Sequence, residues 1–274
     1  MGTFMVCRFI WSISRLAQSY LPLYMLALGG TEVTVGLVSA LGLIAQFLTQ
    51  PIEGYLADFT SNRVTIIKWG TTTLALSYLF YLFAPDATTI LIGAFIINMN
   101  FLHSTSLSSL MADSLTSKQR STGYSFVLAV QRGTPLILTV RGGFIIESFG
   151  PDFGMMVSLT LTIIMDLLVA FMRGRYLREI PHLRKNEAPI AFSLGKILLI
   201  VTTAYKELYL TLRNLPRNLK AIAVISLLGY ITTTIVGPFW IVYATNVIRV
   251  KPTEWGLAMT LSGVTTVAAS FLAE

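Results

Sequence analysis

The sequence predicts an all-α membrane protein with about eight transmembrane helices. Of its 274 residues, 54% are hydrophobic and only 12% are charged, and the mean hydropathy is +0.70. Typical soluble domains carry about 25% charged residues. This chain therefore lacks the polar surface of an ordinary cytosolic enzyme, a disordered protein or a nucleic-acid binder. Its apolar residues gather in segments of about 20, the length that crosses the hydrocarbon core of a bilayer.

Eight segments have this length and polarity, and turn-forming residues separate them. The first segment is not a cleaved signal peptide, because Arg8 and Arg15 interrupt its apolar run and no small-residue cleavage site follows. The pairs Pro85-Asp86 and Gly150-Pro151 mark two of the connections. The predicted spans are residues 4–28, 33–57, 64–84, 88–112, 122–146, 153–172, 221–246 and 254–274.

The basic residues predict the orientation of these spans. The loops after the second and fourth spans hold two Lys or Arg residues each, and the segment after the sixth holds ten. The loops on the opposite side hold only Arg249 and Lys251. Because basic residues are retained in the cytoplasm, this distribution predicts a cytoplasmic N-terminus in a multi-pass protein of the cell membrane. It also accounts for the net charge of +7 without nucleic-acid binding.

A polar segment divides the chain into three predicted parts. Residues 1–173 form a six-span bundle, residues 174–220 a cytoplasmic linker, and residues 221–274 the first two spans of a second bundle. Within the linker, apolar residues recur at helical spacing over 194–213 while Lys206 and Arg213 occupy other faces, which predicts an interfacial amphipathic helix. A ninth span is the alternative there, although its uncharged run is short.

Two segments of the chain resemble each other and one loop carries a motif. Residues 22–36 and 238–256 both run from a proline through aromatic residues to a glycine in the next span. Such repeats point to transporters built from related halves. Residues 54–63 read Gly-Tyr-Leu-Ala-Asp-Phe-Thr-Ser-Asn-Arg. This loop resembles the Gly-x-Leu-Ala-Asp-Arg-x-Gly-Arg-Arg signature of the major facilitator superfamily, at the expected place between spans two and three.

The match to this signature is partial. Its matching positions are Gly54, Leu56, Ala57, Asp58 and Arg63, whereas Phe59, Ser61 and Asn62 depart from it. Two further features are similar to the family: Arg8-Phe9-Ile10 opens the first span, and Asp113 and Arg120 bracket the loop after span four. The resemblance extends over essentially the whole chain, from the first span into the eighth.

The resemblance implies a cytoplasmic gating motif made of Gly54, Asp58, Arg63, Asp113 and Arg120. In such a motif Asp58 helps latch the cytoplasmic side of an outward-facing carrier. Because two of the usual signature residues are replaced, Arg63 is expected to be the main cation and to pair with Asp113. Gly54 is expected where two helices approach closely. The alternative is that these residues only cap a tight loop.

The resemblance also implies twelve spans in two six-span halves. The sequence ends within the eighth predicted span, so four spans are expected to be missing.

Polar residues inside the spans predict a central cavity. Ionisable residues within a membrane are expensive to bury and are functional candidates by default. At 1.5 Å per residue, Arg15 and Arg132 lie near the midplane. The resemblance implies that spans one, four and seven line the cavity, with two, five and eight alongside. The candidate substrate-binding residues are Arg15, Gln18, Asn98, Asn100, His103, Arg132, Tyr230 and Thr234.

Two midplane arginines without an acid at the same depth predict an anionic substrate, because arginine binds carboxylate or phosphate through two parallel hydrogen bonds. In the alternative, the arginines bind backbone carbonyls or pair with Glu53 or Asp166, which lie nearer the cytoplasmic ends. His103 is a candidate proton site, with a purely structural hydrogen bond as the alternative. The coupling ion stays open between a proton and sodium.

The end of span five carries a double glycine, Gly142-Gly143. Drug–proton antiporters of the resembled family carry Gly-Pro-x-x-Gly-Gly there, but Leu138-Thr139 replace the Gly-Pro. We therefore expect the glycines to serve close helix packing. Arg141, beside them, is expected within reach of Glu147.

The sequence thus predicts a secondary transporter that moves a small solute, with an organic anion as the candidate substrate, by alternating access. The alternatives are a drug or metabolite exporter of the same family and a non-transporting truncated membrane protein. No phosphate-binding loop, zinc motif or nucleophile elbow occurs, and Cys7 is the single cysteine. We therefore predict no enzyme activity, no cofactor and no metal site. The expected partners are a small solute, a coupling ion and the lipid bilayer, but no nucleic acid.

Overall fold

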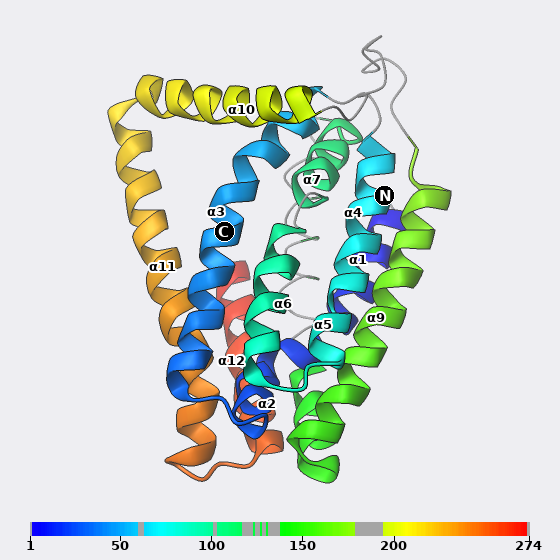
Figure 1. Cartoon of the computed structure of the whole chain (residues 1–274), viewed down its shortest axis with the longest axis vertical. Coiled ribbons are helices and arrows are strands. Elements are labelled where there is room, and N and C mark those ends of the chain that lie inside the picture. The colour runs from blue at the N-terminus through cyan, green and yellow to red at the C-terminus, as the bar shows by residue number, and fades with distance from the viewer. Residues whose placement is uncertain are drawn as a thin grey trace.

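The computed structural model of the chain is a bundle of long helices crossed at one end by another helix (Figure 1). It describes residues 2–59, 63–100, 103–116, 138–178 and 194–272, together with positions 123, 127 and 130. Helices and their connections account for all of these residues, and no strand occurs among them. The prediction of an all-α fold is therefore confirmed.

The first predicted span consists of three consecutive helical segments. These are α1 (Gly2–Ser14), the 3-10 helix η1 (Arg15–Tyr20) and α2 (Leu21–Ala27). The physical reason for the change is Pro22, which has no N–H to donate to the carbonyl of Gln18. The N–H of Leu21 bonds this carbonyl instead, in the tighter 3-10 pattern. The sequence predicted one uniform helix here, so that detail was wrong.

The second and third spans follow the prediction closely. Helix α3 covers Glu32–Phe59, and it begins after Thr31, whose hydroxyl accepts from the N–H of Thr34. Helices α4 (Arg63–Ser77) and α5 (Leu79–Leu82) make up the third span.

The fourth predicted span contains two described helices. Helix α6 (Ala87–Met99) begins at Asp86, whose carboxylate accepts from the N–H of Thr89 at 2.8 Å. Helix α7 (Ser104–Asp113) follows it. Both helices fall on the span predicted over 88–112, and residues 101 and 102 between them lie outside the described part of the chain.

The sixth span is helix α9 (Pro151–Tyr176). Gly150 precedes it with a positive φ of 79°, and Pro151 occupies its first turn, where a missing N–H costs nothing. Asp152 lies at its N-terminus and Arg173 and Arg175 in its last turn, so the charges complement the helix dipole. Of the fifth predicted span, residues 138–149 are described as helix.

The last three helices are α10 (Leu194–Asn214), α11 (Arg217–Asn246) and α12 (Pro252–Leu272). Helix α10 runs across the end of the bundle rather than along it (Figure 1), and the hydroxyl of Tyr205 donates to the carbonyl of Leu48 in α3 at 2.9 Å. This agrees with a helix over 194–213, while its place at a membrane interface stays a prediction.

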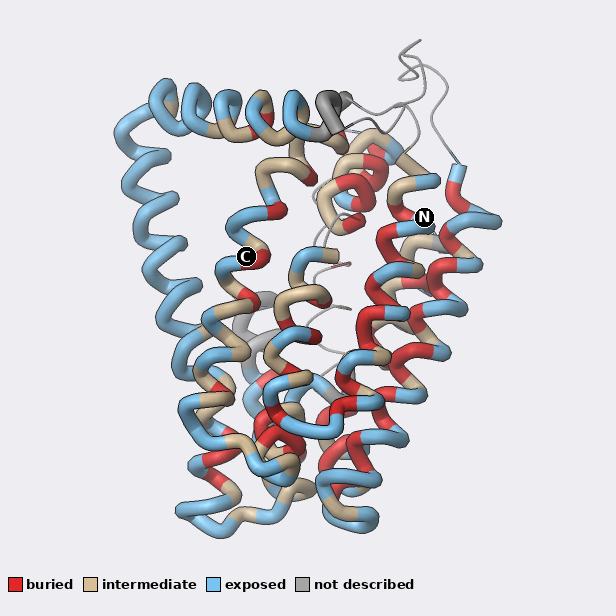
Figure 2. Tube along the Cα trace, viewed as in Figure 1, coloured by how far each residue is buried: buried red, intermediate tan, exposed pale blue. Residues whose placement is uncertain are grey.

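Four helical stretches in the described part of the chain are long and apolar enough to cross a membrane. They are Glu32–Ala57, Ala87–Asp113, Pro151–Tyr176 and Arg217–Asn246. Helix α11 is exposed from Arg217 to Thr233 and becomes buried only near its far end, at Ile241 and Val242. Figure 2 shows this contrast with α4 and α9, whose facing sides are buried. The exposed apolar surface of α11 suits contact with lipid.

Candidate functional site

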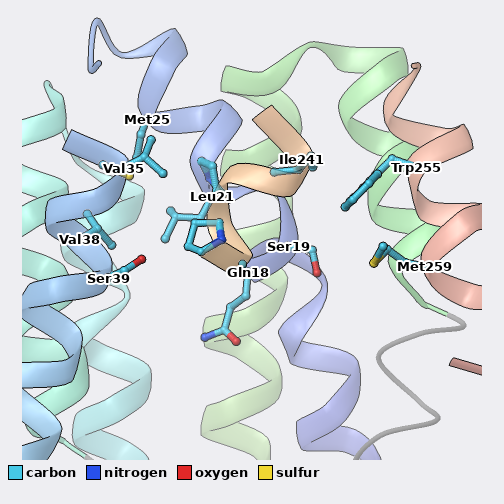
Figure 3. Close-up of a pocket in the computed structure, with 13 residues that line it drawn as sticks. Gln18, Ser19, Leu21, Met25, Val35, Val38, Ser39, Ile241, Trp255 and Met259 are labelled. Atoms are coloured by element: carbon cyan, nitrogen blue, oxygen red, sulfur yellow. The ribbon is translucent and has the colours of Figure 1, made fainter. Parts of the chain in front are cut away.

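A cavity of about 300 Å³ lies between the first span, α3, α11 and α12. Its walls are mainly apolar, with Val38 and Ser39 of α3 on one side and Trp255 and Met259 of α12 on the other (Figure 3). Gln18 enters it from η1, and Gly237-Pro238 of α11 also line it. The change from α-helix to 3-10 helix in span one therefore lies beside the cavity.

Gln18 connects this cavity to a buried aromatic and cationic cluster. Its Nε2 donates to the hydroxyl of Tyr78 at 3.0 Å, and Nη1 of Arg15 donates to the same hydroxyl. The Arg15 guanidinium also lies 4.1 Å from the ring centroid of Trp11 and 5.7 Å from that of Tyr78. Stacking on aromatic faces is a favourable way to hold a guanidinium away from water. The sequence predicted Arg15 and Gln18 but missed Tyr78 and Trp11.

The Arg15 guanidinium keeps hydrogen-bonding capacity. Its Nε and Nη2 atoms are buried and have no hydrogen-bond partner among the described residues. A buried donor left unpaired costs about 1–3 kcal/mol, and more when it is charged. An anion or an acceptor on a bound solute would therefore be stabilised if it reached these two nitrogens.

An acid of the sixth span lies within electrostatic range of Arg15. Asp166 is fully buried, and its Oδ1 accepts from the hydroxyl of Ser14 at 2.7 Å. Its electrostatic neighbours are Arg15 and Arg173, yet no described residue hydrogen-bonds its Oδ2. Arg173 is also fully buried and donates to Thr71 at 2.6 Å. The sequence placed Asp166 as an alternative partner of Arg15, but it gave Arg173 no site role.

The other predicted cavity residues fall into separate contacts. Oδ1 of Asn98 accepts from Nε2 of Gln46 at 2.8 Å, and Oε1 of Gln46 accepts from the hydroxyl of Tyr230 at 2.7 Å. This chain joins α6, α3 and α11 through Gln46, which sequence reasoning missed. Asn100 donates to the hydroxyl of Ser77 in α4.

His103 is 3% exposed and packs closely against α4. A Cβ placed on Gly70 would lie 2.9 Å from the Cβ of His103. Thr234 is partly exposed on α11. Arg132 lies outside the described residues, so its place beside Arg15 in one cavity stays a prediction.

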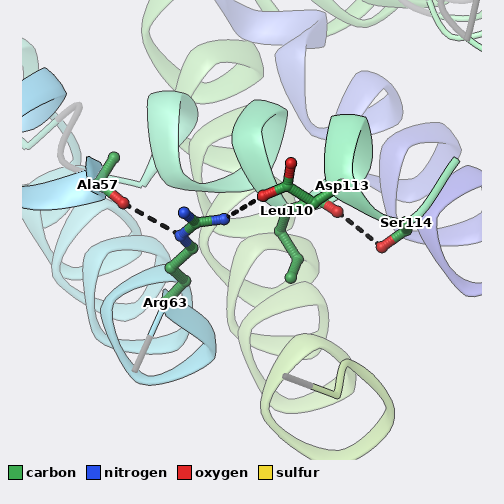
Figure 4. Close-up of polar contacts among 5 residues, drawn as sticks. All are labelled: Ala57, Arg63, Leu110, Asp113 and Ser114. Atoms are coloured by element: carbon green, nitrogen blue, oxygen red, sulfur yellow. Dashed lines mark hydrogen bonds and ion pairs between the residues drawn. The ribbon is translucent and has the colours of Figure 1, made fainter. Parts of the chain in front are cut away.

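The gating motif has its predicted ion pair. Nη1 of Arg63 lies 2.6 Å from Oδ2 of Asp113, and Nε of Arg63 donates to the carbonyl of Ala57 at 3.0 Å (Figure 4). These contacts join the ends of α3 and α7 to the start of α4. The side chain of Asp58 and the whole of Arg120 lie outside the described part.

No atom of the described residues lies within 4 Å of a Cβ placed on Gly54. Close packing at this glycine therefore stays a prediction.

Close approach occurs at the opposite end of the bundle. A Cβ on Gly143 would overlap the carbonyl oxygen of Pro252 and lie 2.7 Å from the hydroxyl of Tyr20. A Cβ on Gly256 would lie 2.7 Å from the Cα of Val140. This agrees with the packing role predicted for Gly142-Gly143. Glu147 pairs with Lys251 at 3.5 Å rather than with the predicted Arg141, because α12 begins beside the end of span five.

Comparisons with known proteins agree with this architecture. The family model described as Major Facilitator Superfamily matches residues 2–273. No curated protein matches the sequence. Among solved structures, the chain is similar to an auto-inhibited peptide transporter of the POT family, with a TM-score of 0.53 and 14% sequence identity. That alignment covers 97% of this chain and 51% of the solved chain. The chain thus spans about half the length of this neighbour, and the likeness concerns the fold.

Proposed function

Because the chain belongs to the Major Facilitator Superfamily, we propose that it acts in secondary transport of a small solute across a membrane. The proposed mechanism is alternating access, in which two helical bundles rock about a central site. The family consists of transporters rather than enzymes. The finer proposal assigns residues 1–173 to one bundle, residues 174–220 to a cytoplasmic linker and residues 221–274 to a second bundle, with the N-terminus in the cytoplasm.

One observation supports a solute site most directly. Gln18 lines the cavity and also donates to Tyr78, the residue that holds Arg15. Arg15 bonds the same Tyr78 hydroxyl as Gln18, and two of its buried nitrogens have no partner in the described part of the chain. A solute with a carboxylate or phosphate group supplies the acceptors that these nitrogens need. We therefore propose an organic anion as the substrate class, with Arg15 as the anion-binding residue and Gln18 as a polar contact.

The test is uptake of labelled organic anions into proteoliposomes that contain the full chain. Arg15→Ala is expected to reduce anion uptake about tenfold or more, because a hydrogen bond to a charged group contributes about 1.5–3 kcal/mol. Arg217→Ala is the matched control, since Arg217 is exposed on α11, and it should transport normally. Anion uptake that survives Arg15→Ala unchanged would exclude this role for Arg15.

The apolar cavity wall supports a second candidate. Leu21, Pro22, Met25, Trp255 and Met259 supply most of the contact surface that a bound molecule would meet. Such a wall suits an amphipathic drug or metabolite, and export is the corresponding function. Efflux of hydrophobic cations that survives Arg15→Ala would favour this candidate over the anion transporter.

A non-transporting membrane protein is the remaining alternative. It predicts no solute-dependent flux from correctly folded protein in liposomes. The same assay run with imposed proton and sodium gradients would identify the coupling ion, because only the gradient of the coupled ion should drive accumulation.

A further inference from the structure

The second half of span four is a helix whose N-terminus is capped by another helix. Helix α7 begins at Ser104, and the side chain of its N-cap residue, His103, makes no capping bond. The N–H of Thr105 instead donates to Oε1 of Glu53 in α3 at 2.6 Å. The hydroxyl of Ser104 lies 3.2 Å from Oε1 and 3.4 Å from Oε2 of the same carboxylate. Glu53 therefore holds the first turn of α7 against α3.

Among the described residues, no cation pairs with this buried carboxylate. Glu53 is 2% exposed, and the two ion pairs of the described residues, Arg63–Asp113 and Lys251–Glu147, do not include it. Burial of an ionised carboxylate is costly, and an unpaired one binds a proton more readily. The positive end of the α7 dipole and the two donors act in the opposite direction and favour the charged form. Burial therefore favours the protonated form of Glu53, whereas the helix dipole and the two donors favour its charged form.

The helices packed against α3 are α2, α6, α7, α10 and α11. The described residues of α6 include no titratable group, and α2 carries Tyr24. The groups on the other three helices are His103 and Asp113 on α7, Lys196, Tyr205, Lys206, Glu207, Tyr209 and Arg213 on α10, and Arg217, Lys220, Tyr230 and Tyr243 on α11. Of these, Asp113 pairs with Arg63, Tyr205 donates to Leu48 and Tyr230 donates to Gln46. Lys206 and Glu207 are exposed on α10.

We propose that Glu53 is a proton-binding site whose protonation releases the first turn of α7 from α3. The proton adds to one carboxylate oxygen, which removes the negative charge opposite the helix N-terminus and turns one acceptor into a donor. The N–H of Thr105 then loses its charge-assisted bond. Protonation of Glu53 therefore weakens the contact that holds the N-terminal end of α7 against α3. The C-terminal end of the same helix forms the Arg63–Asp113 ion pair.

The site can be tested without knowledge of the solute. Infrared difference spectra of the full chain in lipid vesicles report the carbonyl stretch of each protonated carboxyl group as the pH is lowered. The wild type should show a band that titrates and that Glu53→Gln lacks. Asp166→Asn, which removes another buried acid, and Glu32→Gln, which removes an exposed one, should keep this band. An unchanged spectrum in Glu53→Gln would overturn the proposal.

A milder variant protects the test against misfolding. Ser104→Ala removes one donor to the charged carboxylate but keeps the acid, so the midpoint of the Glu53 titration should move to higher pH. An unchanged midpoint would contradict the capping geometry.

Amide hydrogen exchange tests the release step. At neutral pH, residues 104–113 should exchange several-fold faster in Glu53→Gln than in the wild type, and this difference should vanish below the titration midpoint. Glu32→Gln should exchange like the wild type at every pH. Equal exchange of this segment in Glu53→Gln and wild type at neutral pH would overturn the release step. Because neither measurement depends on flux, a negative result here is distinct from a failure of the proposed transport function.

Discussion

At the scale of single residues, the buried arginines differ in the groups that they contact. Arg15 rests on two aromatic rings and one tyrosine hydroxyl, whereas Arg173 is completely buried and bonds a threonine hydroxyl. Within the described part of the chain, both guanidinium groups keep two buried nitrogens without hydrogen-bond partners. Unpaired charged donors are expensive in a protein interior, and they are the groups that a bound acceptor would stabilise.

A residue outside the spans gives a prediction for the effect of pH. The Asp86 carboxylate accepts the backbone N–H of Thr89 at 2.8 Å and its hydroxyl at 2.9 Å, and the backbone hydrogen bond is the main cause that holds the pKa of Asp86 below its ordinary value. A group whose pKa is lowered by folding adds stability above its unfolded pKa of about 3.9 and loses it as the pH falls through the folded pKa.

We expect Asp86→Asn to unfold at a lower temperature than the wild type at neutral pH. The difference should shrink as the pH falls below the ordinary range of aspartate, because the wild-type side chain then also becomes neutral. Thermal unfolding in detergent across this pH range measures the effect. A difference between the two proteins that stays constant in acid would rule out the charge of Asp86 as its cause.

At the scale of helices, the points where a helix changes or begins decide where polar groups meet. In the middle of span one, before Pro22, the chain forms a 3-10 helix that carries Arg15 and Gln18. The N-terminus of α7 presents backbone donors, and Glu53 caps one of them. A continuous α-helix has no free backbone donors in its middle, so this cap depends on a helix that begins at Ser104.

The ion pair between α4 and α7 gives a prediction at this scale. The two side chains are 16% and 28% exposed, so solvent screens the Arg63–Asp113 pair only in part. Arg63→Ala and Asp113→Ala should each destabilise the protein, and the double variant should cost less than the sum. We expect a coupling energy of about 0.5–3 kcal/mol in a double-mutant cycle of unfolding free energies. Strictly additive effects would show that the pair contributes nothing to the anchoring of α7.

At the scale of the whole molecule, contacts between the early helices and α12 gather at one end. The hydroxyl of Tyr20 donates to the carbonyl of Thr139 at 2.8 Å and to that of Pro252 at 3.1 Å. Gly143 and Gly256 allow the backbones to meet there. Towards α10, the surface of α11 is exposed instead (Figure 2). The structure is therefore closed by tight packing where Tyr20, Gly143 and Pro252 meet.

Gly143→Val tests this closure. Its added side chain would meet the backbone carbonyl of Pro252, which cannot move aside as a flexible side chain could. Spin labels at positions 149 and 247, both exposed, in a Cys7→Ser background should then give a longer mean distance. Gly229→Val, at a glycine with open space around it, is the control and should leave the distance unchanged. Equal distances in all three proteins would show that this contact does not hold the end closed.

The sequence by itself determined the class of fold, most helix ends and the loop between spans two and three. These features depend on local properties: the length of an apolar run, a proline or glycine at a turn, and a carboxylate before a first helical turn. The residues 33–57 and 221–246 predicted as spans, for example, lie within α3 and α11. The Arg63–Asp113 pair could also be predicted from the sequence, because Arg63 begins α4 and Asp113 ends α7 on the same side of the bundle.

Only the tertiary structure decided which polar groups meet inside the bundle. Tyr78 receives both Arg15 and Gln18, Gln46 joins Asn98 to Tyr230, and Glu53 caps a helix 51 residues further along the chain. These contacts depend on the rotation of each helix about its own axis and on where a helix is interrupted. Side-chain packing between distant segments sets both, and the periodicity of one apolar span contains no information about the neighbour it will face.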